Sequence, residues 1–351
     1  MFAAKRVERA AATMPRMIAT RKLRRARVLI VGCGDVGLRT LPLFQARAAA
    51  PRVIALTHQP ERAAELRAAG ALPIPGDLDA RKRLARLAGI ARHVLHLAPP
   101  ARDGDIDRRT RALLAALRAP RRSVARGAHP VRRGPSFIVP EGPFRAASKA
   151  ASRRAPLRFV YASTTGVYGD CGGAIIDETR PARPGNDRAL RRVSAEKQLR
   201  AAGVESGWRV SIVRIPGIYA ENRLPLARIE RAMPALVERD DVYTNHIHAD
   251  DLAAIIVRAL ARGRPQRVIN ASDDTDLRMA DYFDRVADAY RLPRVPRITR
   301  EEADTRLEPI TLSFMRESRR LRNARLKREL GYALRYPTVD DFLRAHAARA
   351  T

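Results

Sequence analysis

A glycine-rich turn directly follows a strand-forming run near the beginning of the chain. The run 28–31 is four branched apolar residues, and a G-x-G-x-x-G pattern comes straight after it. In such a turn the first glycine makes the tight bend, the second lets the backbone approach a pyrophosphate, and the third lets the next helix pack close. The free N–H groups at the start of that helix then face the anion. The spacing predicts a dinucleotide site formed by Gly32, Gly34, Asp35, Val36 and Gly37.

The end of the second expected strand, 53–56, indicates which coenzyme the site takes. Thr57, His58 and Gln59 stand where an NAD site usually offers an acidic residue to the adenosine ribose. This stretch has no carboxylate to repel a 2′-phosphate, and Arg62 lies one turn into the following helix. We therefore expect NADP in preference to NAD, with His58 and Arg62 near the ribose.

A third expected strand, 71–74, ends shortly before Asp77 and Leu78. The adenine edge of a dinucleotide would lie here, so Asp77 is placed to accept a hydrogen bond from the exocyclic amine. We add both residues to the expected coenzyme site.

The rest of the pattern predicts an α/β fold. Apolar strand runs alternate with helix-compatible segments, as is typical of a parallel sheet with helices on both faces. We expect a doubly wound parallel Rossmann sheet in residues 26–272 and a smaller, mostly helical substrate lobe in 273–351. Segments 171–185 and 217–244 are expected to contribute to that lobe. The other expected strands are 93–98, 157–163, 210–214 and 267–270, and the main helices are 36–44, 60–69, 105–117 and 187–202.

The formal net charge of +31 is concentrated rather than evenly spread. Residues 1–27 and 119–156 each carry nine Lys or Arg and one acid, so these two segments hold about half of the excess. Six of the 68 basic residues are lysine, and such arginine enrichment is also what a GC-rich coding sequence produces. The sequence has no zinc-ligand spacing, aromatic stacking signature or helix-turn-helix pattern. We therefore attribute the charge mostly to composition and do not expect nucleic-acid binding, so a nucleic-acid-associated protein with basic arms is the weakest alternative.

Two segments fall outside the alternating pattern. The basic stretch 1–25 lacks the apolar core of a secretory signal, and we expect a disordered leader, with a transit peptide or a misplaced start codon as alternatives. Residues 119–156 are rich in Arg, Pro, Gly, Ser and Ala. We expect disorder there, with a lid or an anion-binding arm as the alternative. No run of about 18 apolar residues exists. Because Cys33 and Cys171 are too few for a disulfide framework, we expect a cytoplasmic protein with reduced thiols.

The block 161–170, Tyr-Ala-Ser-Thr-Thr-Gly-Val-Tyr-Gly-Asp, is the second strong signal. It resembles the Ser/Thr-rich strand end followed by Val-Tyr-Gly in the extended short-chain dehydrogenase/reductases, the NAD-dependent epimerase/dehydratase family. Further blocks extend the resemblance over nearly the whole chain from Arg27. They are the glycine turn, 76–78, 97–100, 214–219 and 245–251. The resemblance implies a Rossmann fold, NAD(P) as coenzyme and a small-molecule substrate, and it places Leu97 and Ala98 in the coenzyme site.

The resemblance also implies the catalytic residues. In the family, a hydroxyl four residues before the Val-Tyr-Gly tyrosine polarises the substrate oxygen, and this position is Thr164. The general acid/base is the tyrosine of a Tyr-x-x-x-Lys pair, which falls on Arg188 and Arg192 when Glu196 serves as the anchor. Arg188 cannot cycle a proton because a guanidinium stays charged, whereas Arg192 can still hydrogen-bond a ribose. Tyr168 is the first candidate to replace the acid/base, against the alternative that it lines the pocket or packs.

Smaller expectations follow from the same resemblance. Asp250 or Asp251 is expected to cap a helix. Members of the family often pair through helix bundles, so a homodimer is an open alternative, and no metal site is expected. Three arginines are candidates to meet an anionic substrate such as a nucleotide diphosphate, with ordinary surface charge as the alternative: Arg223, Arg319 and Arg320.

The sequence thus predicts an NAD(P)-dependent oxidoreductase or an epimerase/dehydratase-like enzyme that lacks the usual Tyr-x-x-x-Lys pair. Its substrate would be a carbonyl, an alcohol or a nucleotide-linked sugar. The alternative from a different class is a non-catalytic NAD(P)-binding sensor or scaffold that keeps the coenzyme site.

Overall fold

The computed structural model describes residues 25–119 and 155–347. The expectations for the leader 1–25 and the insertion 119–156 therefore concern residues outside the described part of the chain, apart from their border residues.

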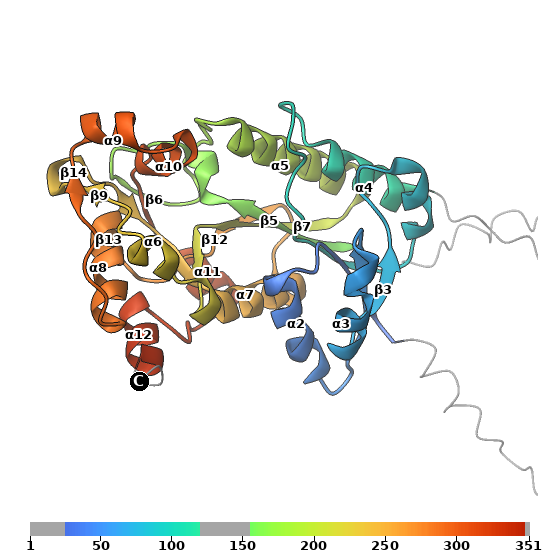
Figure 1. Ribbon diagram of the computed structural model, residues 1–351. Helices are drawn as coiled ribbons and strands as arrows, with labels where there is room; N and C mark the ends of the chain where they lie inside the picture. The colour runs from blue at the N-terminus through green and yellow to red at the C-terminus, as the bar shows by residue number, and fades with distance from the viewer. Residues whose placement is uncertain (1–24, 120–154, 348–351) are drawn as a thin grey trace, which may run out of the picture.

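A seven-stranded parallel sheet forms the centre of the molecule (Figure 1). Apart from the edge strand β3, its strands are short runs of mostly apolar residues buried on both faces, which is why they form continuous rather than alternating apolar patterns. The strand order reverses between β1 and β4, and in such sheets ligands bind beyond the carboxyl ends of the strands at this point. In spatial order the strands are β12 (Arg267–Asn270), β7 (Arg209–Ile215), β5 (Arg158–Thr164), β4 (His93–His96), β1 (Arg27–Val31), β2 (Arg52–Thr57) and β3 (Leu72–Pro75).

Helices cover both faces of this sheet, which confirms the doubly wound α/β prediction (Figure 1). One face carries α2 (Asp35–Gln45), α3 (Ala63–Ala68), α7 (Ala249–Arg262) and α11 (Ala324–Leu330); the other carries α4 (Arg108–Arg118), α5 (Asp187–Ser206) and the 3₁₀ segment η2 (Arg81–Leu87). The expected helix 60–69 begins as a 3₁₀ turn, η1 (Pro60–Arg62), before α3.

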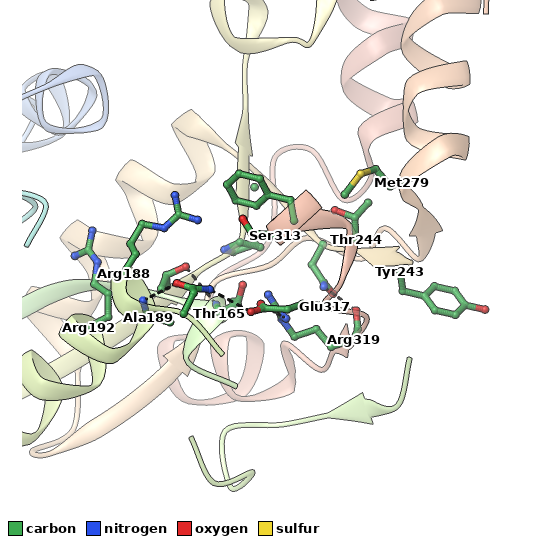
Figure 2. A pocket seen from close by; sticks show the side chains of 17 residues that line it. Thr165, Arg188, Ala189, Arg192, Tyr243, Thr244, Met279, Ser313, Glu317 and Arg319 are labelled. Carbon is green, nitrogen blue, oxygen red and sulfur yellow. Dashed lines mark hydrogen bonds and ion pairs between the residues drawn. The ribbon is translucent and has the colours of Figure 1, made fainter. Parts of the chain in front are cut away.

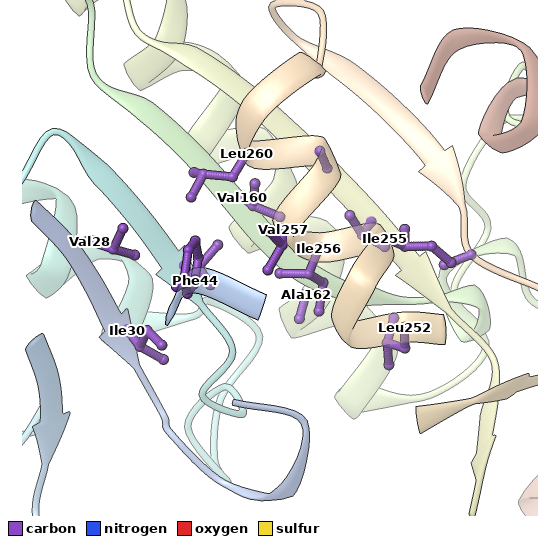
Figure 3. Close-up of a cluster of buried hydrophobic side chains, with 14 of the residues drawn as sticks. Val28, Ile30, Phe44, Val160, Ala162, Leu252, Ile255, Ile256, Val257 and Leu260 are labelled. Atoms are coloured by element: carbon purple, nitrogen blue, oxygen red, sulfur yellow. The ribbon is translucent and has the colours of Figure 1, made fainter. Parts of the chain in front are cut away.

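The apolar face of α7 supplies much of one core layer. Figure 3 shows Leu252, Ile256 and Leu260 of this helix directed toward the sheet, where Val160 and Ala162 of β5 meet them. Burial of one such Leu or Ile side chain contributes roughly 1.5–3 kcal/mol, so the stripe accounts for the position of the helix. The predicted cap of α7 is wrong. His248 is the N-cap, and its Nδ1 accepts from the Asp250 N–H at 3.2 Å.

Asp251 anchors the C-terminal segment instead of capping α7. Its carboxylate accepts hydrogen bonds from the Tyr332 hydroxyl at 2.6 Å and from the N–H groups of Arg335 and Tyr336 at 2.7 and 3.0 Å. The side chain is fully buried, so these three donors replace the water that a carboxylate would otherwise bind.

A buried ion pair joins the sheet to α5. The Arg214 guanidinium on β7 donates to both oxygens of Glu196 on α5 at 3.1 and 2.7 Å, and both residues are almost completely buried. The Ser163 hydroxyl on β5 donates to the same carboxylate at 2.6 Å. Because a lone charge is costly in this interior, the three groups fix the position of α5 against the ends of β5 and β7.

The C-terminal region combines helices with four two-stranded sheets, so it is less purely helical than expected. Its helices are α6 (Leu226–Glu230), α8 (Met279–Ala289), α9 (Arg300–Arg306), α10 (Pro309–Met315) and α12 (Val339–Ala347). The small sheets pair β6 (Ile175–Ile176) with β15 (Arg320–Leu321), β8 (Gly217–Tyr219) with β11 (His246–His248), β9 (Ala235–Leu236) with β14 (Arg297–Ile298), and β10 (Tyr243–Thr244) with β13 (Leu277–Arg278). Three of these sheets thus join segments 171–185 and 217–244 to the C-terminal part.

A buried aromatic and histidine cluster lies between this region and β11. The His246 ring stacks on Tyr282 with centroids 4.1 Å apart, and burial lowers the pKa of His246 to about 3. The nearby Asp273 carboxyl is 3 % exposed, and burial raises its pKa to about 7. The Asp273 Oδ1 atom accepts from the Thr275 N–H, whereas Oδ2 has no hydrogen-bond partner among the described residues.

We expect Asp273→Asn to change how stability depends on pH. The carboxyl pKa is higher in the folded chain than its ordinary value near 3.9, so the folded state holds the proton more tightly. Its contribution is therefore complete below about pH 4 and is lost as the pH rises to about 7, on the order of 1 kcal/mol per pH unit. Urea unfolding between pH 4 and 8 should show that the free energy of unfolding of the variant increases relative to that of the natural chain as the pH rises. The exposed Asp276→Asn is the control, and a parallel course for all three proteins would contradict the prediction.

Candidate functional site

The glycine turn lies between β1 and α2, next to the residues that follow β4. Gly32 has φ +84°, and a Cβ there would stand 2.5 Å from the Ala98 nitrogen, so this backbone approach requires glycine. The N–H groups of Leu97 and Ala98 both donate to the Val31 carbonyl, at 2.8 and 3.0 Å. The structure therefore brings the predicted residues Gly32, Leu97 and Ala98 together at the point where the strand order reverses.

The N-terminus of α2 is open. A Cβ on Gly34 would meet no atom within 4 Å, and no side chain caps the helix there. A Cβ on Gly37 would stand 3.2 Å from Cys33 Sγ, so the third glycine allows the helix to pack on the turn. Burial raises the pKa of Cys33 to about 11, so this thiol stays protonated at neutral pH. Val36 packs on the core from the first turn of α2.

Charged side chains surround this helix start. Asp35 pairs with Arg39 at 3.0 Å and with Arg223 at 3.2 Å. Arg39 also pairs with Asp250 at 2.5 Å. Two arginines therefore flank the Asp35 carboxylate, which offsets the negative charge at the place where a pyrophosphate would bind. Arg223, a candidate to meet an anionic substrate, instead lies beside the glycine turn.

Arg62 reaches back to the glycine turn from η1. Its Nη1 donates to the Cys33 carbonyl at 2.9 Å, and its Nε and Nη2 donate to the Glu65 carboxylate at 2.8 and 2.9 Å. The guanidinium is therefore held beside the turn, with part of its charge offset by Glu65. His58 follows β2 and is exposed. The hydrogen bond from Arg109 is the main reason why the pKa of Asp79 is lowered, and the charge of His58 acts in the same direction.

Asp77 and Leu78 form the turn after β3. Asp77 Oδ1 accepts from the Asp79 N–H at 2.9 Å, and Leu78 is buried in the core. The Asp79 carboxylate is bound by Arg109 of α4, whose Nη2 lies 2.6 Å away. One carboxylate oxygen of Asp77 thus already accepts a hydrogen bond within the turn, and the second oxygen is available to a ligand.

A cavity of about 370 Å³ lies beyond the carboxyl ends of β5 and β7 (Figure 2). The start of α5 borders it on one side, and β10, α8 and α10 border it on others. The lining residues are Thr164, Thr165, Gly166, Asn186, Arg188, Ala189, Arg192, Pro216, Gly217, Tyr243, Thr244, Asn245, Met279, Ser313, Phe314, Glu317 and Arg319.

Thr164 ends β5 with its side chain on this cavity. Its Oγ1 accepts a hydrogen bond from the Gly166 N–H at 3.3 Å. Since the oxygen accepts from the backbone, the hydroxyl proton is free to be donated to a ligand oxygen. This is the arrangement that an oxyanion-side donor requires.

The two arginines at the expected Tyr-x-x-x-Lys positions both line the cavity. Arg192 Nη1 donates to the Ala162 carbonyl at 2.6 Å and to the Tyr161 hydroxyl at 3.1 Å. Arg188 carries its guanidinium carbon 4.9 Å from the centre of the Phe314 ring. In Figure 2 both side chains extend from α5 on the side opposite Met279.

Tyr168 is not among the described residues that line the cavity. Its side chain is 1 % exposed, its hydroxyl donates to Asn270 Oδ1 at 2.7 Å, and Arg214 covers its ring at 4.6 Å. Burial raises the pKa of Tyr168, which is the opposite of what a tyrosine acid/base needs at neutral pH. These contacts favour the alternative that Tyr168 packs in the protein interior over a role as the acid/base.

Glu317 is a cavity residue that the sequence did not reveal. Its Oε1 accepts from Asn186 Nδ2 at 3.2 Å, and its Oε2 pairs with Arg319 Nη1 at 2.9 Å. A Cβ on Gly166 would stand 3.7 Å from Thr164 Oγ1 and 4.0 Å from Glu317 Oε2, so the hydroxyl and the carboxylate face one small space. Glu317 lies 153 positions after Thr164 in a segment without a motif, and tertiary contacts such as the pairing of β15 with β6 and the bond from Asn186 bring it here.

Two classes of site are not found in the described part of the chain. No group of three or more His, Cys, Asp or Glu side chains within it could hold a metal ion. None of its helices is long and apolar enough to cross a membrane.

The described residues form a Rossmann fold, with a cavity at the carboxyl ends of β5 and β7. The model of the NAD dependent epimerase/dehydratase family matches residues 144–272. Comparison with curated proteins gave no match. Over residues 144–272 the chain is thus similar to the NAD dependent epimerase/dehydratase family.

Solved structures share this architecture over almost the whole chain. A functionally unknown conserved protein from Silicibacter pomeroyi is 28 % identical, with a TM-score of 0.68 over 93 % of this chain and 99 % of that one. UDP-glucose 4-epimerase from Thermotoga maritima, solved with UDP-glucose, is 16 % identical, with a TM-score of 0.64 over 92 % and 97 %. UDP-glucuronic acid 4-epimerase from Bacillus cereus, in complex with NAD, is 14 % identical, with a TM-score of 0.65 over 92 % and 97 %.

We expect Gly34→Ala to weaken coenzyme binding without loss of stability. The new methyl group would meet no protein atom within 4 Å, yet it would stand beside the open start of α2. Titration with NADH and NADPH, followed by coenzyme fluorescence, should show at least tenfold weaker binding, and the melting temperature without coenzyme should be unchanged. Ser206→Ala, an exposed substitution at the end of α5, is the control. Unaltered affinity in Gly34→Ala would place the coenzyme elsewhere.

Proposed function

We propose that the protein is an NAD(P)-dependent oxidoreductase that acts on a carbonyl or alcohol group. The observation that carries this proposal is the cavity in which the Thr164 hydroxyl and the Glu317 carboxylate face the same space, beside a Rossmann glycine turn. The family supports the coenzyme, and two of the similar structures contain NAD or UDP-glucose.

The residues of the turn fit a dinucleotide. Gly34 leaves space at the start of α2, no side chain occupies the helix N-terminus, and Arg39 and Arg223 offset Asp35. When bound, the coenzyme supplies or accepts the hydride. The chain contributes the N–H groups that hold the pyrophosphate, and Arg192 lies where it could also hydrogen-bond a ribose.

NADP is the proposed coenzyme in preference to NAD. Arg62 is held beside the glycine turn through the Cys33 carbonyl, and the end of β2 offers Thr57, His58 and Gln59 in place of an acid. A 2′-phosphate would then replace part of the interaction between Arg62 and Glu65.

Arg62→Glu is expected to weaken NADPH binding at least tenfold and to leave NADH binding nearly unchanged. The reason is that a carboxylate would repel the 2′-phosphate but not a ribose hydroxyl. Arg67→Glu, an exposed substitution on α3, introduces the same charge change and should affect both coenzymes little. Equal losses for NADPH and NADH in Arg62→Glu would rule out the proposed preference.

The reacting groups can be assigned from the cavity. During oxidation of an alcohol, the hydroxyl proton passes to Glu317 while the hydride, with its electron pair, leaves the carbon and a carbonyl forms. Reduction is the reverse. Thr164 donates its hydroxyl hydrogen bond to the reacting oxygen throughout. Glu317 has capacity for this because Asn186 and Arg319 use only part of the acceptor sites on its two oxygens.

We expect Glu317→Gln and Thr164→Val each to lower kcat by about 10²–10⁴, because each removes a proton-handling group or a donor at the reacting oxygen. Arg319→Gln breaks the same ion pair but keeps the carboxylate, so it should retain most activity if Glu317 transfers the proton. Thr164→Ser should also retain activity, because serine keeps the hydroxyl group. The kcat of each variant would be measured with a substrate found by screening carbonyl compounds for coenzyme oxidation. Full activity in Glu317→Gln would contradict its assigned role.

The alternative is a non-catalytic NAD(P)-binding sensor. Its specific support is that Arg188 and Arg192 occupy the positions of the family's tyrosine and lysine, and a guanidinium cannot transfer a proton. The two functions separate in one experiment. A sensor binds coenzyme, seen as a rise in melting temperature with ligand concentration, but turns over no member of the substrate panel.

A further inference from the structure

Arg188 is the one lining arginine whose charge no described residue offsets. Arg192 is bound by the Ala162 carbonyl and the Tyr161 hydroxyl, and Arg319 is paired with Glu317. The guanidinium of Arg188, by contrast, makes no hydrogen bond or ion pair within the described part of the chain. Its contact is the face of Phe314, 4.9 Å from the ring centre. The cavity therefore has a cation ready for an anionic ligand.

Arg188 is itself exposed, and the Phe314 ring is the group that contacts its guanidinium. Phe314 is 50 % exposed, which is unusual for a large apolar side chain, and a cation over its ring orients the guanidinium plane. Arg188 is also the second residue of α5, a helix of 20 residues whose N-terminal end carries positive partial charge. The Asn186 side chain caps the Ala189 N–H of that first turn. The positive end of the helix therefore favours an anion beside Arg188, although the Asn186 oxygen and Asp187 in the first turn offset part of this charge.

The volume of the cavity and the guanidinium of Arg188, unpaired among the described residues, indicate which class of anion fits there. About 370 Å³ is near the lower end of small-molecule sites, and the reacting part of the coenzyme must share it. A single uncommitted guanidinium matches one carboxylate, which it can bind through two parallel hydrogen bonds. A phosphate monoester carries nearly twice that charge and would require further donors.

We infer that Arg188 anchors the carboxylate of a small hydroxy acid or oxo acid, whose oxygen at the reacting carbon lies between Thr164 and Glu317. This inference rests on the proposed oxidoreductase function, and it names the substrate class. It also explains the exchange of the family's tyrosine for arginine: the position has become a binding residue, and proton transfer has moved to the carboxylate across the cavity.

Binding of an acid and of its uncharged match tests the inference. The probes are 2-oxo acids of three to six carbons, each with its methyl ester, titrated by calorimetry into protein saturated with NADP⁺, in which no reduction can take place. At least one acid should bind about tenfold more tightly than its ester. Arg188→Gln should remove that difference and leave ester and coenzyme binding unchanged. Arg188→Lys should recover part of it, because the charge returns without the planar fork.

Arg111→Gln is the matched control. This arginine is exposed on α4, and its side chain has no polar partner among the described residues, so the same loss of charge should leave acid binding intact. Equal binding of acids and esters, equal effects of Arg188→Gln and Arg111→Gln, or preference for phosphate monoesters over every acid would each overturn the inference. Failure of the proposed function has a different signature, which is acid binding that depends on Arg188 without turnover by NADPH.

Discussion

The close contact between Gly32 and Ala98 is the constraint on which the coenzyme side of the molecule depends. The loops after β1 and β4 approach until a single Cβ at position 32 would overlap backbone atoms. This approach lets both Leu97 and Ala98 bind the Val31 carbonyl, and it leaves the start of α2 facing an open space. A glycine with positive φ is the residue that allows such a turn at no steric cost. The strand order reverses at the same point, so the turn and the ends of β4 and β5 share one edge of the sheet.

A second fixed point holds the reacting side. Glu196, Arg214 and Ser163 form a buried network that joins α5 to β7 and β5. Thr164 follows Ser163 directly, and Arg192 lies one turn before Glu196 on α5. The network therefore sets the distance between the strand end and the helix that together border the cavity. Breaking a buried pair leaves an uncompensated charge, so this geometry resists small distortions.

The cavity combines side chains from distant parts of the chain. Thr164 stands at the end of β5, and α5 contributes Arg188 and Arg192. The carboxylate of Glu317 arrives from the C-terminal segment. Arg319 offsets its charge, and Arg188 is left uncompensated at the start of α5. An anion is the ligand that this balance of charges favours.

The sequence by itself determined the parallel sheet, the glycine turn and Thr164, because each rests on a local pattern: buried apolar runs, glycine spacing and a hydroxyl at a strand end. The resemblance to the NAD-dependent epimerase/dehydratase family rests on the same short blocks. The partner of Thr164 was not, since Glu317 has no motif and reaches the cavity through the pairing of β15 with β6. Arg62 was expected near the turn, yet its bond to the Cys33 carbonyl depends on how η1 folds back. Tyr168, Asp250 and Asp251 show the same limit: their neighbours in space come from distant parts of the chain, so tertiary packing alone decided what each side chain contacts.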